Sequence, residues 1–243
     1  MIKWNSGLLI FLLLCCVGTF AQGPKSSCPD GPHTLYSRDA ATLDSAPGHP
    51  VRVTSPDGNK TLVVKAVSDK EDPGGSHIDY RVISGRETLT ANLPGFNGEV
   101  AWAPDSKAFA VTQTEGGGGL GSRVYVFYVE EGSLRKIDVS RPIEKDFGSP
   151  VKCDVEVPPN TGFVSWQTDS STLLVAAEVA PVSVCSCSGT YRVYEMNLPS
   201  AAIARTYSQT EAKKQFWNLL GCELRGADDS CVQRLEARSH IKP

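Results

Sequence analysis

The stretch at residues 102–111, WAPDSKAFAV, joins a turn to an apolar run and decides the fold class. Proline fixes φ and an aspartate side chain can bond the backbone beside it, so Pro104-Asp105-Ser106 predicts a tight turn. Ala108 to Val111 is apolar throughout, which is typical of a strand buried on both faces. The stretch therefore predicts the hairpin between the first two strands of an antiparallel sheet.

The same order of short strand, tight turn and aliphatic strand recurs on both sides of this stretch. The other two turns are Pro56-Asp57-Gly58 and Thr168-Asp169-Ser170. Each copy continues with a third run of aromatic and β-branched residues and a shorter, more polar fourth run, as expected of an outer edge strand. The chain is therefore predicted to be all-β, with three four-stranded antiparallel units at 49–93, 98–142 and 161–208 that together form a repeat domain at 49–208.

The motif Trp102-Ala103-Pro104-Asp105-Ser106-Lys107, followed by Arg123-Val124-Tyr125-Val126, resembles the repeats of TolB-type β-propellers. The first unit keeps Ser55-Pro56-Asp57-Gly58, and the third unit has lost the proline. The resemblance implies four-stranded sheets ringed about an axis, and closed rings typically need four or more of them. Three units imply a partial propeller, or strands merged into a sandwich or barrel. Apolar end faces would then be covered by the amino-terminal segment, the carboxyl-terminal tail or a second chain.

Residues 1–21 have the organisation of a secretory signal, with Lys3, an apolar run from Gly7 to Val17 and the small residue Ala21. The run is about half of the ~20 residues needed to cross a bilayer core, which favours cleavage over a membrane anchor. We expect cleavage before Gln22 and a secreted or periplasmic protein with no stable membrane insertion. Lipid attachment at Cys15 or Cys16 is disfavoured, because lipoprotein signals place a small residue before the acylated cysteine.

Six cysteines remain after cleavage, an even number that favours disulfides in an exported protein. The loop between the second and third strands of a unit lies at the same end as the link to the next unit. Cys185 and Cys187 fall in such a loop and Cys153 in such a link, so we predict that Cys153 bonds Cys185 or Cys187. A zinc site at Cys185 and Cys187 is disfavoured, because the sequence has no second close pair of Cys or His residues at the usual spacing. The remaining candidates are Cys28, for the other member of that pair, and Cys222 with Cys231, which could be bonded to each other.

The segments outside the repeats divide into an extension at 22–48 and a helical tail at 209–243. Ser208 to Glu211 has the pattern of a capping box, and an apolar face follows up to Gly221, which is placed to end that helix. A second short helix is predicted from Asp228 to Arg238.

The composition excludes several function classes. The formal net charge is -3, and removal of Lys3 with the signal makes it -4, so no basic excess favours nucleic acid or anionic lipid. The glycine run at 116–121 precedes a β-like run rather than a helix, which disfavours a phosphate loop. Asp57, Asp105 and Asp169 occupy equivalent turns, which explains them as structural. We predict no catalytic residue, no metal site and no cofactor.

The longest loops, at 69–77, 115–122 and 178–189, share one end of the predicted units. Binding residues concentrate on loops held by a rigid scaffold. We therefore expect an exported, non-enzymatic binding or scaffold protein that contacts a protein or cell-envelope partner, with homo-oligomerisation left open. The alternative is an envelope enzyme or enzyme inhibitor whose site is assembled from scattered loop residues. Convergence of these ionisable side chains in one pocket would favour the enzyme; the candidates are Glu71, Asp72, His77, Glu115 and Glu178.

Overall fold

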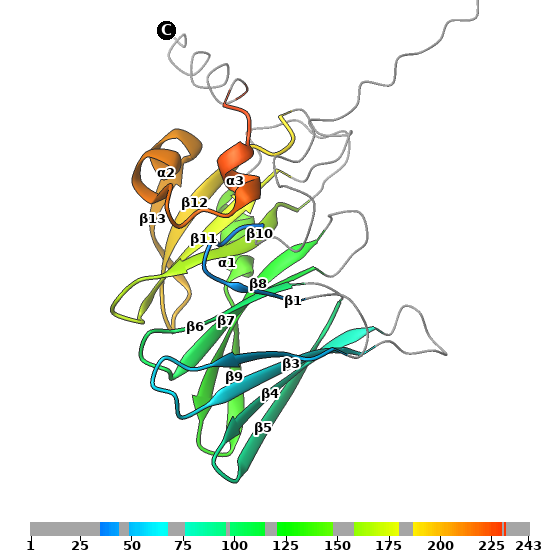
Figure 1. Cartoon of the computed structure of the whole chain (residues 1–243). Helices are drawn as coiled ribbons and strands as arrows, with labels where there is room; N and C mark the ends of the chain where they lie inside the picture. Colours follow the sequence, from blue (N-terminus) through cyan, green and yellow to red (C-terminus); the bar gives the residue numbers. More distant parts are fainter. Residues whose placement is uncertain are drawn as a thin grey trace, which may run out of the picture.

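The computed structural model describes residues 35–43, 49–67, 76–95, 98–114, 121–147, 158–179, 187–229 and 231, and every structural statement below refers to these residues. They form three separate antiparallel sheets with three short helices (Figure 1). The predicted all-β class and the three antiparallel units are confirmed, as separate sheets rather than one merged barrel.

Each sheet is built on a meander of four consecutive strands, to which sheet 2 adds β1 at its edge, and every pairing is antiparallel. Sheet 1 has the order β2-β3-β4-β5, sheet 2 the order β1-β6-β7-β8-β9, and sheet 3 the order β10-β11-β12-β13. The bounds in sheet 1 are β2 Val51–Thr54, β3 Thr61–Val67, β4 His77–Ser84 and β5 Glu87–Pro94. Those in sheet 2 are β1 Ala41–Leu43, β6 Gly98–Trp102, β7 Ala108–Thr114, β8 Ser122–Glu130 and β9 Ser133–Asp138. Those in sheet 3 are β10 Asn160–Trp166, β11 Thr172–Glu178, β12 Tyr191–Asn197 and β13 Ala202–Ser208.

The three predicted turns have the expected chemistry. Their aspartates accept a backbone N–H two residues along the chain: Asn59 for Asp57, Lys107 for Asp105 and Ser171 for Asp169. The hydrogen bond from the Ser55 hydroxyl, together with that from the N–H of Asn59, holds the pKa of Asp57 below its ordinary value. The turn aspartates are therefore structural groups, as the repeat predicted.

Neighbouring sheets are joined by the same two contacts at both junctions. Trp102 Nε1 donates to the carbonyl of Val53 at 2.9 Å, and Trp166 Nε1 donates to that of Ala101 at 3.2 Å. At the turns, the N–H of Asp57 donates to Ser106 Oγ and the N–H of Asp105 donates to Ser170 Oγ, both at 3.0 Å. Each sheet thus holds the one before it through a tryptophan and a serine.

Apolar cores fill the spaces between the sheets. Sheets 1 and 2 enclose an aromatic cluster in which the rings of Phe109 and Phe127 stack at 5.1 Å and Tyr80 lies 5.5 Å from Phe127. Sheets 2 and 3 enclose a second core that also takes Ile143 and Phe147 of α1 (Ser140–Phe147). Each fully buried side chain of this kind is worth about 1.5–3 kcal/mol.

The two end faces of the array are protected in different ways. On sheet 3 the outer face packs against α2 (Gln209–Phe216) and α3 (Cys222–Gly226). On sheet 1 the outer face is largely polar, with Arg52, Lys65 and Arg81 exposed on it, so it needs no cover. The carboxyl-terminal tail therefore supplies the cover that sheet 3 was expected to need.

The tail differs in part from the sequence-based prediction. The capping box is present, with Ser208 Oγ accepting from the N–H of Glu211 and the Glu211 carboxylate accepting from the N–H of Ser208. However, α2 ends at Phe216, and Gly221 precedes α3 instead of ending α2. The physical reason is the close approach of the amino-terminal segment, because a Cβ on Gly221 would lie 2.3 Å from the carbonyl oxygen of Leu35. Most of the second helix predicted at 228–238 lies outside the described residues.

In the described part of the chain, no helix has the length and apolar character needed to span a membrane.

Candidate functional site

Residues 35–43, here called the strap, connect parts of the molecule that are far apart in the sequence. Its β1 pairs with β6, with Ala41 opposite Val100. Its other end bonds the tail, since the N–H of Gly221 donates to the Tyr36 carbonyl at 2.8 Å and the N–H of Arg38 donates to Leu219. The strap therefore ties sheet 2 to the helices that cover sheet 3.

Tyr36 makes the buried side-chain contacts of the strap. Its side chain is 5% exposed, and it lies so close to β10 that a Cβ on Gly162 would be 1.9 Å from Tyr36 Cγ. Its hydroxyl lies 3.2 Å from Ser122 Oγ and donates to Glu178 Oε2 at 3.2 Å. Burial, reinforced by the charge of Glu178, holds the pKa of Tyr36 well above its ordinary value, so the phenol keeps its proton.

Glu99 accepts hydrogen bonds from the backbone of the strap. The N–H of Tyr36 donates to both of its carboxylate oxygens, at 3.2 and 3.3 Å, and the N–H groups of Leu35 and Ser37 also bond this carboxyl group. The side chain is 2% exposed. Burial raises the pKa of Glu99 to about 8, against the lowering effect of the three N–H groups.

Glu178, at the end of β11, completes the cluster. It is 3% exposed, and its pKa is raised to about 8 by burial and then by the negative charge of Glu223. The Tyr36 hydroxyl lowers that pKa but does not offset the burial. Near neutral pH the carboxyl groups of Glu99 and Glu178 are therefore mostly protonated, which lets two acids lie buried beside one tyrosine.

The polar groups around this cluster bond one another. Asn160 Oδ1 accepts from the N–H of Gly121 at 2.9 Å, and Thr161 Oγ1 lies 2.5 Å from Ser140 Oγ. Perturbed carboxyl groups are typical of active sites, yet these face the strap rather than solvent, and no His lies in the contacts described. The arrangement fastens the strap to the sheets.

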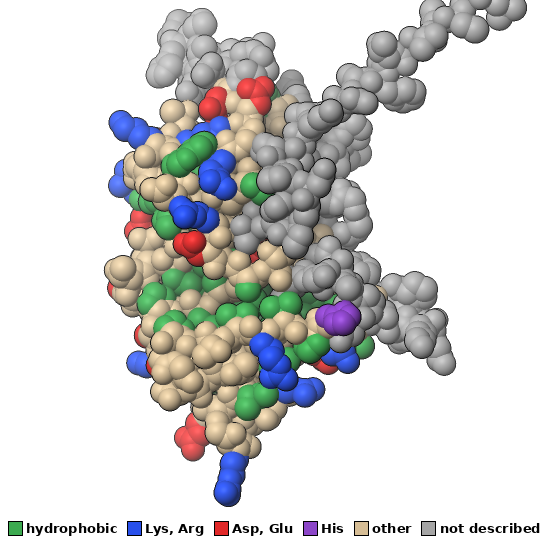
Figure 2. Space-filling view, in the orientation of Figure 1, with side chains coloured by type: hydrophobic (Ala, Val, Ile, Leu, Met, Phe, Trp, Pro, Cys, Tyr) green, Lys and Arg blue, Asp and Glu red, His purple; other side chains and the backbone are tan. Residues whose placement is uncertain are grey.

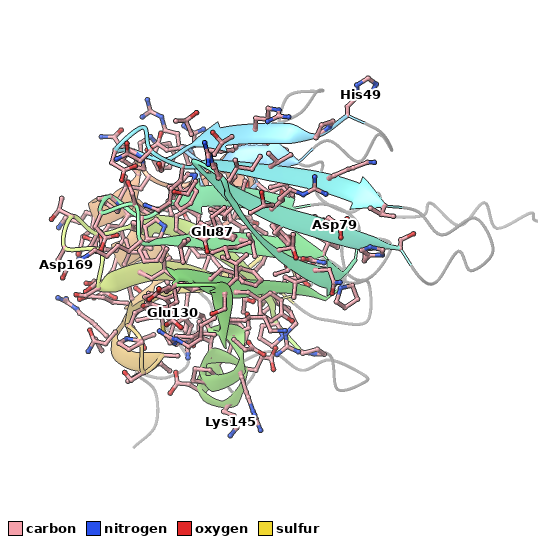
Figure 3. All side chains as sticks on the ribbon, turned by 90° about the horizontal axis from the view of Figure 1, so that it is seen from below. His49, Asp79, Glu87, Glu130, Lys145 and Asp169 are labelled. Carbon is pink, nitrogen blue, oxygen red and sulfur yellow. A yellow bond between two sulfur atoms is a disulfide. The ribbon has the colours of Figure 1, made fainter. Side chains whose placement is uncertain are left out.

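Of the predicted loop residues, the structure describes Glu178 and His77, which lie on different sheets. Glu178 lies in the buried cluster, whereas His77 lies on β4 of sheet 1, 3.3 Å from Asp79 Oδ1 and partly exposed. Figure 3 places Asp79 and His49 toward one end of the molecule and Asp169 at the other. Glu71, Asp72 and Glu115 lie outside the described residues. In the ranges that the structure describes, no group of three or more potential metal ligands occurs.

The disulfide pattern corrects one prediction. Cys187 is bonded to Cys231, with the Cα atoms 5.6 Å apart, so Cys231 is not bonded to Cys222 and Cys187 is not bonded to Cys153. The segment before Cys231 is held against α2, since Gln209 Nε2 donates to Asp229 Oδ1 at 2.6 Å and to the carbonyl of Asp228. The tail is thereby fixed near the loop that carries Cys187. Cys222 is also disulfide-bonded. Cys28, Cys153 and Cys185 lie outside the described residues.

An open groove of about 480 Å³, here called the central groove, lies between the first strands of the three sheets and the strap. Figure 2 shows a band of hydrophobic side chains crossing the molecule above sheet 1. Asp39 is the one carboxylate among the described residues that line the groove. The rest of the lining is apolar, hydroxyl-bearing or backbone, and it includes Val53, Thr54, Pro56, Trp102, Phe163 and Trp166.

Sequence reasoning missed the strap cluster and the groove. Tyr36 and Glu99 are separated by 63 residues, and Tyr36 and Glu178 by 142, so no local spacing connects them. One available signal was Gly162, a glycine at the start of the third predicted unit, because a glycine in a strand often marks the close approach of another segment.

Comparisons with known proteins identify no family. No model of a known protein family matches the chain, and no curated protein matches it significantly. The chain is similar to the solved structure of Pyrococcus horikoshii acylaminoacyl peptidase, with 11% identity and a TM-score of 0.38 over 69% of this chain and 25% of that one. It is also similar to the AtxE2 isopeptidase with a bound astexin-3 peptide, with 12% identity and a TM-score of 0.42 over 76% of this chain and 33% of that one. The chain thus spans a third or less of these structures, and likenesses at such TM-scores carry no argument about its activity.

Proposed function

We propose that this protein is an exported, non-enzymatic binding or scaffold protein of the cell envelope, built on a three-unit relative of the TolB-type repeat. The observation that carries the proposal is the contrast between the buried carboxyl groups and the central groove. The described carboxyl groups whose pKa values are raised, Glu99 and Glu178, are buried beneath the strap. The central groove has a single carboxylate among its described lining residues and otherwise offers apolar surface and strand edges.

Two further features support export and a rigid scaffold. The Cys187–Cys231 disulfide suits an oxidising compartment. The signal-like segment at 1–21 predicts a mature protein that begins at Gln22. The loops that carry Glu71, Asp72 and Glu115 are proposed as additional contacts with the partner.

The test is affinity capture with the mature protein as bait, using the envelope fraction of the source cells. We expect a reproducible partner that is retained from one preparation to the next and released when the bait is reduced and unfolded. The absence of any such partner, combined with turnover of an envelope substrate, would overturn the proposal in favour of the enzyme. In that case E99Q and E178Q, which keep the size of each side chain, would show whether the buried acids take part in the turnover.

A further inference from the structure

The outer edge of β2 is open toward the central groove. In the described part of sheet 1, β2 pairs only with β3. The bond from the N–H of Ser55 to the carbonyl of Lys60 fixes the alternation of the antiparallel ladder. Val51 and Val53 accordingly direct their backbone groups to β3, and Arg52 and Thr54 direct theirs to the open edge. Thr54 and Val53 both line the groove.

In sheet 2 the equivalent edge is paired with an added strand. In β6 the position equivalent to Arg52 is Val100, as both lie five residues before the aspartate of their turn. Val100 is opposite Ala41 of β1, so the strap adds an extended strand to the edge of sheet 2. The equivalent edge of sheet 1 has the same backbone geometry and lies beside the strap, without an added strand from the described residues.

Apolar surface adjoins one side of this edge. Val53 is only half-buried, and the groove beside it is lined by Ala41, Trp102 and Phe163. A strand added to β2 would direct every second side chain into the groove, because side chains alternate between the faces of a sheet. Small or β-branched apolar side chains fit a lining of this kind.

Positive charge adjoins the other side. Arg52 is exposed on the outer face of sheet 1, where the register places Val63 of β3 opposite it and Arg81 of β4 opposite Val63. Arg52 has no ion pair among the described residues. The side chain directly opposite Arg52 on an added strand would share this face, and an acidic side chain there gives a favourable cross-strand pair.

We propose that the open edge of β2 binds an extended partner peptide as an additional antiparallel strand, with apolar side chains toward the central groove and acidic side chains toward Arg52. The inference rests on the binding function proposed above and specifies its site and its ligand chemistry. Backbone bonds to Arg52 and Thr54 would supply affinity, and the alternation of the side chains would supply specificity.

The test uses the full mature protein and a short acetylated and amidated peptide that alternates valine with glutamate. A peptide that alternates valine with lysine is the control ligand. Binding is followed by tryptophan fluorescence, because Trp102 and Trp166 line the groove, and by shifts of the amide NMR signals of Arg52 and Thr54. We expect the glutamate peptide to bind and the lysine peptide to bind at least about tenfold more weakly.

Three variants locate the site. R52E should reverse the preference between the two peptides, whereas R81E, the same charge change two strands away on the same face, should alter affinity by less than about twofold. T54P removes the N–H that faces the open edge and should abolish binding of the glutamate peptide, since proline is tolerated at edge positions but cannot donate. Far-UV circular dichroism and the Cys187–Cys231 peptide map verify that each variant is folded.

Equal binding of both peptides, or unchanged binding by T54P, would overturn the proposal. So would a concentration-dependent dimer that T54P abolishes, because the edge would then take a second copy of this chain. If T54P and R52E still capture the envelope partner that the wild-type protein captures, the edge is not the site although the binding function stands. If the wild-type protein binds the glutamate peptide but captures no partner, the edge is a strand-binding site and the proposed function fails on its own test.

Discussion

The substitution E178Q tests whether the strap cluster is held together by protonated carboxyl groups. Burial raises the pKa of Glu178 from its ordinary 4.5 to about 8 in the folded protein. The folded state therefore keeps a proton that the unfolded state releases as the pH rises above 4.5. The stabilising contribution is fully present below that pH and is lost as the pH approaches about 8.

The size of the effect follows from the pKa difference. Each pH unit within this window costs about 1.4 kcal/mol per group, so between roughly pH 5 and pH 7 Glu178 alone accounts for about 3 kcal/mol. Glu99, whose pKa is also raised to about 8, adds a similar amount. The glutamine of E178Q is always neutral and can still accept from the Tyr36 hydroxyl, so the variant should match the wild type near pH 5 and exceed its stability by about 3 kcal/mol near pH 7.

The assay is urea unfolding at several pH values across this window, with the free energy of unfolding obtained by linear extrapolation. E131Q, at the exposed turn between β8 and β9, is the matched control and should leave the pH dependence unchanged. The reasoning is refuted if the wild type gains stability between pH 5 and pH 7, or if E178Q shows the same pH slope as the wild type.

Three further predictions test the packing, the hydrogen bonding and the disulfide described above. G162A places a Cβ 1.9 Å from Tyr36 Cγ, so it should destabilise the protein by about 1–3 kcal/mol in urea unfolding, and adding Y36A should give less than the sum of the two single effects. W166F removes the indole N–H that joins sheet 3 to sheet 2 and should cost about 1 kcal/mol or more; no loss would mean that this bond is not a joint. C187S with C231S opens a link across 44 residues and should lower stability by about 4 kcal/mol in non-reducing thermal unfolding, and a peptide map that pairs Cys231 otherwise would contradict the structure.

The strands and turns were predictable because their causes are local. Asp57 and Asp105 bond backbone N–H groups two residues away, and such bonds depend on the residues inside one turn. The aliphatic runs after the turns are apolar on both faces, and this does not depend on which segment covers them. The pattern alone therefore predicts second strands such as β7. The capping box at Ser208 is likewise contained within four neighbouring residues.

The strap and its cluster were not predictable from such patterns. A glutamate in a strand suggests an exposed position, and Glu99 is buried only because backbone N–H groups from a distant segment bond it. The partner of Cys231 depends in the same way on where Gln209 holds the tail. The remaining loop candidates, Glu71, Asp72 and Glu115, lie outside the described residues, so their role stays a prediction.

The contacts between the sheets also limit how many units the array can hold. Sheets 2 and 3 each reach back with a tryptophan and a serine, but sheet 1 has Thr54 and Gly58 at the equivalent positions and so lacks the groups that would grip a preceding unit. At the other end, α2 and α3 occupy the face on which a following unit would stack. The two end units therefore limit the array to three sheets. A fourth repeat grafted onto either end would lack the tryptophan and serine contacts or would be blocked by α2 and α3.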